Sequence, residues 1–212
     1  MVRPFPGIAP ELSRLAAIYA LVAVVSGRRE EEIRRLLDPP GVVIFGLYGL
    51  EGEDDQAAPP PELRLAMAAL ANRVPGAWVE DKGASLALHY RLTPNPEEAE
   101  SMLGAPVAEL AARYGRALVL GKMVFELVPA STPGKGRVVL REALARRLSA
   151  CLYAGDDQAD LEAFAALDEL RDRGMATVKV AVRSAEAPAR LIESADLTLD
   201  VPAAVLELLR SL

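Results

Sequence analysis

The sequence predicts an α/β protein in which a doubly wound parallel core is interrupted by an inserted α+β module. Near both ends of the 212-residue chain, helix-spaced apolar residues alternate with short, Val-rich runs, a pattern typical of sheets covered by helices on both faces. Between them lies the charged and proline-rich segment EGEDDQAAPPP, which can neither extend a strand nor begin a helix before its last proline. We therefore predict residues 1–50 as the first part of the core, 51–129 as an inserted cap and 130–212 as the second part of the core.

The first core segment begins with apolar residues at helical spacing, which predict a helix over residues 10–19. The apolar run at 20–25 does not alternate and ends at a Ser-Gly pair, as expected of a buried strand. A second helix at 30–37 and a second strand at 42–45 follow. This alternation predicts one β-α-β unit.

The inserted segment shows a different order of elements. Pro61 begins a helix at a position where its missing N–H costs nothing. Asn95 caps a longer helix, with Gly104 and Pro106 as potential breaks. The expected helices are 61–73 and 95–114, and the expected strands are 77–80, 84–90, 117–120 and 124–128.

Strand-helix alternation returns after residue 129. The Pro-Gly-Lys-Gly sequence at 133–136 predicts a turn that leads into a helix over 138–148. A strand at 150–154 then ends in the acidic loop GDDQAD. The remaining elements are helices at 161–173, 187–194 and 201–212 and strands at 177–182 and 197–199.

Composition excludes several classes of partner. The net charge of −6 argues against a nucleic-acid binder, because affinity for the phosphate backbone comes from clustered Lys and Arg. The single cysteine excludes a disulfide framework and a multi-thiolate zinc site. No uncharged apolar run is long enough to span a membrane, and the start lacks the order of regions seen in signal peptides. We expect a cytoplasmic monomer that binds a small molecule.

Three carboxylates lie within five residues at the end of the strand predicted at 150–154: Asp156, Asp157 and Asp160. Open parallel sheets bind ligands at this edge. Crowded carboxylates repel one another, so a divalent cation among them would explain the arrangement, and oxygen ligands favour Mg²⁺. An acidic helix N-terminus stabilised by the helix dipole explains it equally well. From the residues alone both interpretations stay open.

Two further motifs offer groups that suit a phosphate. Ser26 and Arg28 follow the first predicted strand and supply a hydroxyl and a guanidinium, although a serine that only caps the next helix is the commoner case. Lys135 lies between two glycines, where the backbone can approach a ligand and the ammonium can neutralise charge. A solvated lysine in a turn is again commoner, and the spacing is not that of a Walker A loop.

Polar residues on the predicted strands of the insert could bind a sugar, which needs convergent donors and acceptors. Glu80, Lys82 and Arg91 lie on or beside the two strands at 77–90. His89 is the only histidine, which excludes a His-based metal cluster. Glu126 is a lone carboxylate in an apolar strand, and alternation predicts that it points outward.

Taken together and in order, five segments resemble trehalose-6-phosphate phosphatases, which are phosphohydrolases of the haloacid dehalogenase superfamily. The resemblance covers nearly the whole chain, and HYR together with GDDxxDxxAF makes it specific. The segments are VVSGR at 24–28, VEDKGASLALHYR at 79–91, FELVP at 125–129, GKG at 134–136 and YAGDDQADLEAF at 153–164.

The resemblance implies a haloacid-dehalogenase-type core with an inserted α+β cap, and hydrolysis of trehalose 6-phosphate to trehalose and phosphate. By resemblance, Ser26 and Lys135 would hold the transferred phosphoryl group. Asp156 and Asp160 would bind Mg²⁺ directly or through water, with Asp157 in support. Contacts to the sugar hydroxyls would fall to Arg28, Glu80, Lys82, Arg91 and Glu126.

The chain departs from this family at its nucleophile. The family's Asp-x-Asp-Gly-Thr motif, which supplies the attacking aspartate on the first core strand, is absent, and the first aspartate of the chain is Asp38. Tyr48 and Gly49 also stand where many relatives carry His-Gly. We therefore expect a truncated start, no turnover by the 212 residues, and exposed flanks on the strands at 22–25 and 152–153. The alternatives are a catalytically dead sugar-phosphate-binding protein and a phosphatase for another sugar phosphate.

Overall fold

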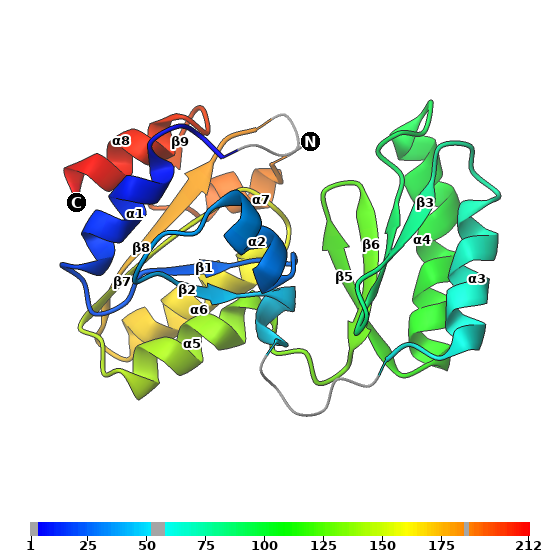
Figure 1. The fold of residues 1–212 in the computed structure, drawn as a ribbon, viewed down its shortest axis with the longest axis horizontal. Helices are drawn as coiled ribbons and strands as arrows, with labels where there is room; N and C mark the ends of the chain where they lie inside the picture. Colours follow the sequence, from blue (N-terminus) through cyan, green and yellow to red (C-terminus); the bar gives the residue numbers. More distant parts are fainter. Residues whose placement is uncertain (1–3, 52–57, 185–186) are drawn as a thin grey trace. The chain divides into compact units, whose positions relative to one another are not determined.

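The chain divides into two units, one of which is built from both ends of the sequence. The computed structural model describes residues 4–51, 58–184 and 187–212. Unit 1 comprises Met1–Gly52 and Pro133–Leu212, and unit 2 comprises Glu53–Thr132 (Figure 1). The boundary predicted at EGEDDQAAPPP falls in large part outside the described residues.

Unit 1 contains two short parallel sheets. β1 (Ala23–Val25) pairs with β2 (Val43–Phe45). β8 (Ala176–Val182) lies between β7 (Ala150–Gly155) and β9 (Leu197–Leu199). Since all these pairs are parallel, every connection between neighbouring strands crosses over through a helix.

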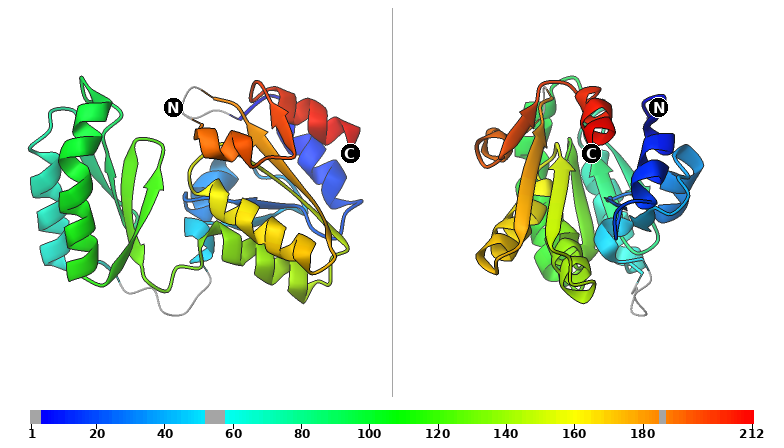
Figure 2. Two further views of the ribbon diagram at one scale, coloured as in Figure 1. Left: turned by 180° about the vertical axis from the view of Figure 1, so that it is seen from behind. Right: turned by 90° about the vertical axis from the view of Figure 1, so that its left-hand side faces the viewer.

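Helices cover both faces of the β7-β8-β9 sheet. Tyr153 of β7 packs on the cluster formed by α5 and α6, which includes Leu167 and Leu170. The next residue, Ala154, faces the opposite side toward α1 and α8, which lie side by side (Figures 1 and 2). The helices of unit 1 are α1 (Ile8–Ala16), α2 (Glu30–Leu36), the 3₁₀ turn η1 (Leu47–Gly49), α5 (Gly134–Ala145), α6 (Asp160–Asp172), α7 (Ala189–Glu193) and α8 (Ala204–Ser211).

The two sheets of unit 1 remain separate within the described residues, because no ladder joins β1 to β7. Leu152 and Val178 pair in register and are 37% and 40% exposed. The exposure of Leu152 agrees with the expectation for residues 152–153, but Tyr153 does not, because it packs against the cluster of α5 and α6.

Unit 2 is an antiparallel sheet with two helices on one face. The strand order is β3-β4-β6-β5, and α3 and α4 pack on the sheet through a core that includes Leu63, Met67, Leu88, Leu103 and Leu127. Among the described residues, no helix of either unit combines the length and hydropathy needed to cross a membrane. The elements of unit 2 are α3 (Pro61–Ala71), β3 (Trp78–Asp81), β4 (Leu86–His89), α4 (Pro96–Arg113), β5 (Arg116–Gly121) and β6 (Val124–Pro129).

The helix predicted over 95–114 is confirmed, and α4 continues through the potential breaks at Gly104 and Pro106, because Leu103 and Val107 are buried on either side of the proline and their burial offsets a penalty of about 3 kcal/mol. The start predicted for the helix over 138–148 is wrong. α5 begins at Gly134 rather than at residue 138. The predicted Pro-Gly-Lys-Gly turn therefore forms the first turn of a helix.

Candidate active site

Asp160, the first residue of α6, organises the acidic loop that follows β7. Its Oδ2 atom accepts hydrogen bonds from the backbone N–H groups of Asp156 at 2.7 Å and Asp157 at 2.9 Å. Its Oδ1 atom accepts from Lys135 Nζ at 2.6 Å and from the hydroxyl of Tyr153 at 2.8 Å. Each oxygen of this buried carboxylate thus accepts two hydrogen bonds. Together these bonds hold the acidic loop in place relative to α5 and β7.

Two glycines allow this close packing. A methyl group at Gly155 would overlap the carboxyl group of Asp160. At Gly136 a methyl group would lie 2.5 Å from the backbone oxygen of Glu162, so α5 and α6 approach closely only because this side chain is missing. The close approach brings Lys135 on α5 to the acidic loop before α6.

Lys135 is held as a buried cation between two carboxylates. Its residue is 6% exposed, and Nζ lies 2.6 Å from Asp160 Oδ1 and 3.3 Å from Asp157 Oδ1. Burial alone would lower the pKa of Lys135, but the charges of Asp160 and Asp157 outweigh it and raise that pKa. The ammonium is therefore charged at neutral pH.

The pKa values of the two carboxylates move in opposite directions. Burial acts to raise the pKa of Asp160, but Lys135 and the hydrogen bonds donated to its carboxylate outweigh burial and lower it. Burial, together with the nearby charge of Asp160, raises the pKa of Asp157. Burial likewise raises the pKa of Tyr153 well above its ordinary value, which keeps its hydroxyl a hydrogen-bond donor.

The three aspartates also form a group that fits a divalent cation. One carboxylate oxygen from each of Asp156, Asp157 and Asp160 lies within 4.8 Å of the others, and an all-oxygen set suits Mg²⁺. The interactions of the carboxylates within the protein differ: Asp160 accepts four hydrogen bonds, and Asp157 forms an ion pair with Lys135. The donor set therefore fits a magnesium ion, which Asp156, Asp157 and Asp160 could hold together.

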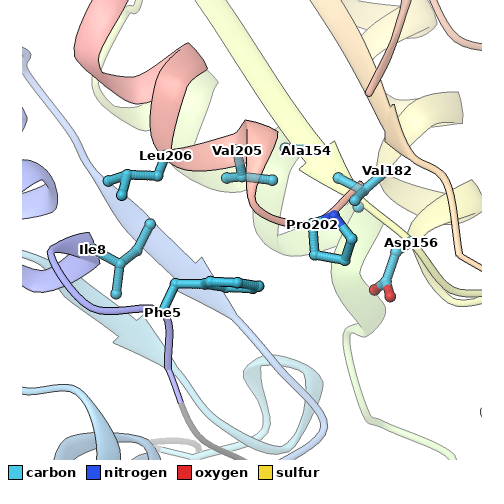
Figure 3. A pocket seen from close by; sticks show the side chains of 9 residues that line it. Phe5, Ile8, Ala154, Asp156, Val182, Pro202, Val205 and Leu206 are labelled. Carbon is cyan, nitrogen blue, oxygen red and sulfur yellow. The ribbon is translucent and has the colours of Figure 1, made fainter. Parts of the chain in front are cut away.

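Asp156 also lines a pocket of about 300 Å³ in unit 1 (Figure 3). Its carboxylate stands at one side of an otherwise apolar wall, which side chains from the N-terminal segment, β7, β8 and the start of α8 supply. The other lining residues are Phe5, Ile8, Ala154, Gly155, Val182, Pro202, Val205 and Leu206.

Ser26 and Arg28 follow the carboxyl end of β1. The Ser26 hydroxyl oxygen accepts a hydrogen bond from the backbone N–H of Arg28 at 3.1 Å, a local turn of the kind that serine forms before a helix. This bond leaves the hydroxyl hydrogen available for donation. The guanidinium of Arg28 lies 3.8 Å from Glu32 on α2, and the Arg28 side chain is 48% exposed.

In unit 2, Glu126 forms a buried polar cluster with Lys82 and Ser85. Lys82 Nζ lies 3.0 Å from Glu126 Oε2, and the Ser85 hydroxyl donates to Oε1 at 2.6 Å. Alternation along β6 does place Glu126 opposite the core residue Phe125. The prediction that it simply points outward is incomplete, however, because Glu126 is only 1% exposed.

Glu80 and Arg91 lie elsewhere on unit 2. His89 Nε2 and Glu80 Oε2 are 2.9 Å apart, and the His89 ring stacks on Trp78 with a centroid separation of 4.1 Å. Arg91 donates to the backbone oxygen of Lys122 at 3.2 Å, in the turn between β5 and β6. Unit 2 thus pairs Lys82 with Glu126, while Glu80 and Arg91 bind other partners.

The sequence did not indicate the roles of Tyr153 and Ser85. Strand alternation could have placed Tyr153 on the face of β7 that α6 covers, but the contact of its hydroxyl with Asp160 depends on the fold of the loop. Ser85 immediately precedes β4, and no local pattern links it to Glu126 on β6.

Comparison with known proteins identifies the family of this chain. The family model described as trehalose-phosphatase matches residues 2–202. The trehalose-phosphate phosphatase of Mycobacterium avium (strain 104) is 32% identical over 198 residues, covering 85% of this chain and 49% of the relative. The trehalose-6-phosphate phosphatase of Escherichia coli (strain K12) is 29% identical over 184 residues, covering 80% of this chain and 66% of the relative. The chain thus spans about half to two thirds of the length of these curated relatives.

Solved structures share the fold. The C-terminal domain of a C. albicans trehalose-6-phosphate phosphatase superposes with a TM-score of 0.79 at 21% identity, covering 98% of this chain and 83% of that chain. A phosphatase of the haloalkanoate (HAD) superfamily from Bacteroides thetaiotaomicron gives a TM-score of 0.60 at 15% identity, covering 99% of this chain and 88% of that one. The predicted haloacid-dehalogenase-type α/β fold is confirmed, and the chain belongs to the trehalose-phosphatase family.

Proposed function

We propose that the chain binds trehalose 6-phosphate and Mg²⁺ as part of a phosphatase that releases trehalose and phosphate. The observation that carries this proposal is the buried Lys135 ammonium, held by Asp157 and Asp160 beside Asp156 at the carboxyl end of β7. A fixed cation beside a cluster of carboxylates can serve a phosphoryl group and a metal ion at once.

Unit 1 would bind the phosphate. Lys135 is positioned in advance by its carboxylate partners, so its charge can stabilise a phosphoryl group without reorganisation. The Ser26 hydroxyl hydrogen can donate to a phosphate oxygen. Asp156 would hold Mg²⁺, with Asp157 and Asp160 in support, and the bound ion would supply Lewis-acid stabilisation of charge on the phosphate.

Unit 2 would bind the disaccharide. A carbohydrate presents many hydroxyl groups, and Glu126 and Glu80 supply acceptors while Lys82 and Arg91 supply donors. Among these, the Lys82–Glu126 pair is pre-ordered by Ser85. Arg28 of unit 1 remains a further candidate for a hydroxyl contact.

The proposal for the 212 residues is restricted to binding, because the nucleophile motif of the family is not among them. The 212 residues contain no Asp-x-Asp-Gly-Thr motif, and we propose that they bind substrate without turning it over. The second candidate function, a sugar-phosphate-binding protein without catalysis, is favoured by the same observation.

Phosphate release from trehalose 6-phosphate with Mg²⁺ separates these functions. The 212-residue chain is compared with a version extended upstream to the next in-frame start, while calorimetry measures binding of trehalose 6-phosphate, glucose 6-phosphate and sucrose phosphate to both. We expect binding of trehalose 6-phosphate to both chains and turnover by the longer one. Binding without turnover in either chain would favour the binding protein, and a preference for another sugar phosphate would reassign the substrate.

A further inference from the structure

The face of the unit 2 sheet opposite α3 and α4 carries an ordered set of polar and aromatic side chains. α3 and α4 cover the face to which Leu86 and Leu88 point, so alternation places the intervening Ala87 and His89 on the opposite face. In the ladder, Ala87 pairs with Glu80 on one side and with Glu126 on the other. Glu80 and Glu126 therefore flank a small residue in one row, and their backbone positions are about 10 Å apart at two strand spacings.

The next cross-strand pair on this face, Trp78 and His89, is an aromatic stack. Trp78 pairs with His89 across the strands, and their rings lie 4.1 Å apart with an interplanar angle of 14°. Trp78 is nevertheless 44% exposed and does not join the core cluster of unit 2. Its exposed indole therefore offers a large, rigid apolar surface beside the polar groups of the same sheet face.

His89 is restrained from two directions. Trp78 packs against the face of its ring, and Nε2 is hydrogen-bonded to Glu80 Oε2 at 2.9 Å. An ionised Glu80 can only accept, so the imidazole donates in this pair. Within the described ranges this bond uses Oε2, and the Oε1 atom of Glu80 can accept from a ligand.

We propose that Trp78 is a stacking platform for a hexopyranose ring, and that His89 is a positioning residue that orients Glu80 toward the hydroxyl groups of that ring. The electron-rich indole face attracts the weakly positive C–H groups on the flat side of a pyranose. Glu80 then accepts hydroxyl hydrogens at the ring edge. This inference rests on the proposed function, because it assigns part of the sugar-binding surface of the same site.

A purely structural role is the alternative, since a cross-strand aromatic pair also stabilises a sheet. The two roles differ in what a substitution changes. A structural pair affects unfolding and leaves ligand selectivity alone. A platform affects affinity for the sugar and leaves the binding of inorganic phosphate unchanged.

The chain offers a direct probe, because Trp78 is its only tryptophan. The 212-residue protein is titrated with trehalose, trehalose 6-phosphate and inorganic phosphate while the fluorescence of Trp78 is recorded. We expect both sugars to shift the emission and inorganic phosphate to leave it unchanged. Met102→Ala, at a 53% exposed position on α4, is the control variant and should keep this response.

Calorimetry on variants completes the test. Trp78→Leu should weaken trehalose 6-phosphate binding about tenfold, whereas Trp78→Phe should stay within about threefold. His89→Ala should also weaken binding, and His89→Gln should restore it because the carboxamide can donate to Glu80. Urea unfolding of each variant confirms that it folds.

The outcomes separate this inference from the function on which it rests. Tight binding of trehalose 6-phosphate by Trp78→Leu, equal to that of the parent, would overturn the platform and leave the proposed function intact. Equal binding by His89→Ala and His89→Gln would overturn the positioning role. If the parent chain binds phosphate but neither sugar, the proposed function itself fails.

Discussion

Replacing Asp160 with asparagine tests the view that this carboxylate holds the candidate active site together. In the folded protein it accepts from Lys135, Tyr153 and the backbone N–H groups of Asp156 and Asp157, all within 2.9 Å. An asparagine can accept on one side only. If its oxygen faces the backbone amides, its NH₂ group faces the ammonium and the hydroxyl, and both donors lose the acceptor that Asp160 supplied.

The magnitude follows from burial. Lys135 is 6% exposed and Asp160 is 3% exposed, so solvent screens the pair weakly. Removing one partner of a buried ion pair costs about 3–5 kcal/mol. At a typical urea dependence of about 2 kcal/mol per molar, the unfolding midpoint of unit 1 should fall by roughly 2 M.

Urea unfolding recorded by circular dichroism measures this loss, while the fluorescence of Trp78 reports unit 2 and should keep its midpoint. The double variant Lys135→Met/Asp160→Asn supplies the control, because it also removes the ammonium that Asp160→Asn alone would leave with Asp157 as its remaining partner. We expect it to lose at least about 2 kcal/mol less than the sum of the single variants. A strictly additive double variant, or a loss below about 1 kcal/mol for Asp160→Asn, would refute the pairing.

The same pair predicts a pH dependence with a definite sign. The pKa of Asp160 is lowered in the folded state, so its stabilisation is fully present above the ordinary aspartate pKa of about 3.9 and is lost as the pH falls below it. The stability difference between the parent and Asp160→Asn should therefore shrink on acidification.

Three further predictions concern packing and alkaline titration. Gly136→Ala should push α5 away from the backbone oxygen of Glu162 and weaken phosphate binding without unfolding unit 2; unchanged calorimetric affinity would contradict this. Burial raises the pKa of Tyr90 to about 12, so its contribution to stability is present below pH 10 and lost between about pH 10 and 12; Tyr90→Phe should flatten the alkaline decline measured by thermal unfolding. Leu88→Ala, at a position 0% exposed, should cost about 2–5 kcal/mol, whereas Leu65→Ala, at 72% exposure, should change the unfolding midpoint little.

Much of the fold could be predicted because local patterns agree with it. The Val-rich run at 20–25 predicted a buried parallel strand, and β1 does pair in parallel with β2, although its residues are not fully buried. The strands predicted at 150–154 and 177–182 correspond to β7 and β8, which also pair in parallel. Helical spacing likewise predicted α3 and α6 to within two residues at each end. The start of α5 was wrong, because the Pro-Gly-Lys-Gly segment predicted as a turn forms the first turn of the helix. α4 matches its predicted range and keeps Pro106 inside it, because buried side chains anchor both flanking turns.

The residues of the candidate site could be named from the sequence, but their contacts could not. Asp156, Asp157 and Asp160 are close in sequence, so a cluster was predictable from spacing alone. Lys135 precedes Asp160 by 25 residues, and a lysine between glycines is usually solvated. Its burial depends on the close approach of α5 to α6.

The sequence by itself determined the element types, the order of the core and insert segments, and the residue types that could serve a phosphate, a metal ion and a sugar. These properties follow from short-range periodicity, turn chemistry and motif order, which act over a few residues. Only the tertiary structure decided that Asp160 binds Lys135 and Tyr153, that Glu126 is buried beside Lys82, and that Trp78 stacks on His89. Each of these contacts joins different secondary-structure elements, and register and helix packing bring them together over distances that no local pattern encodes.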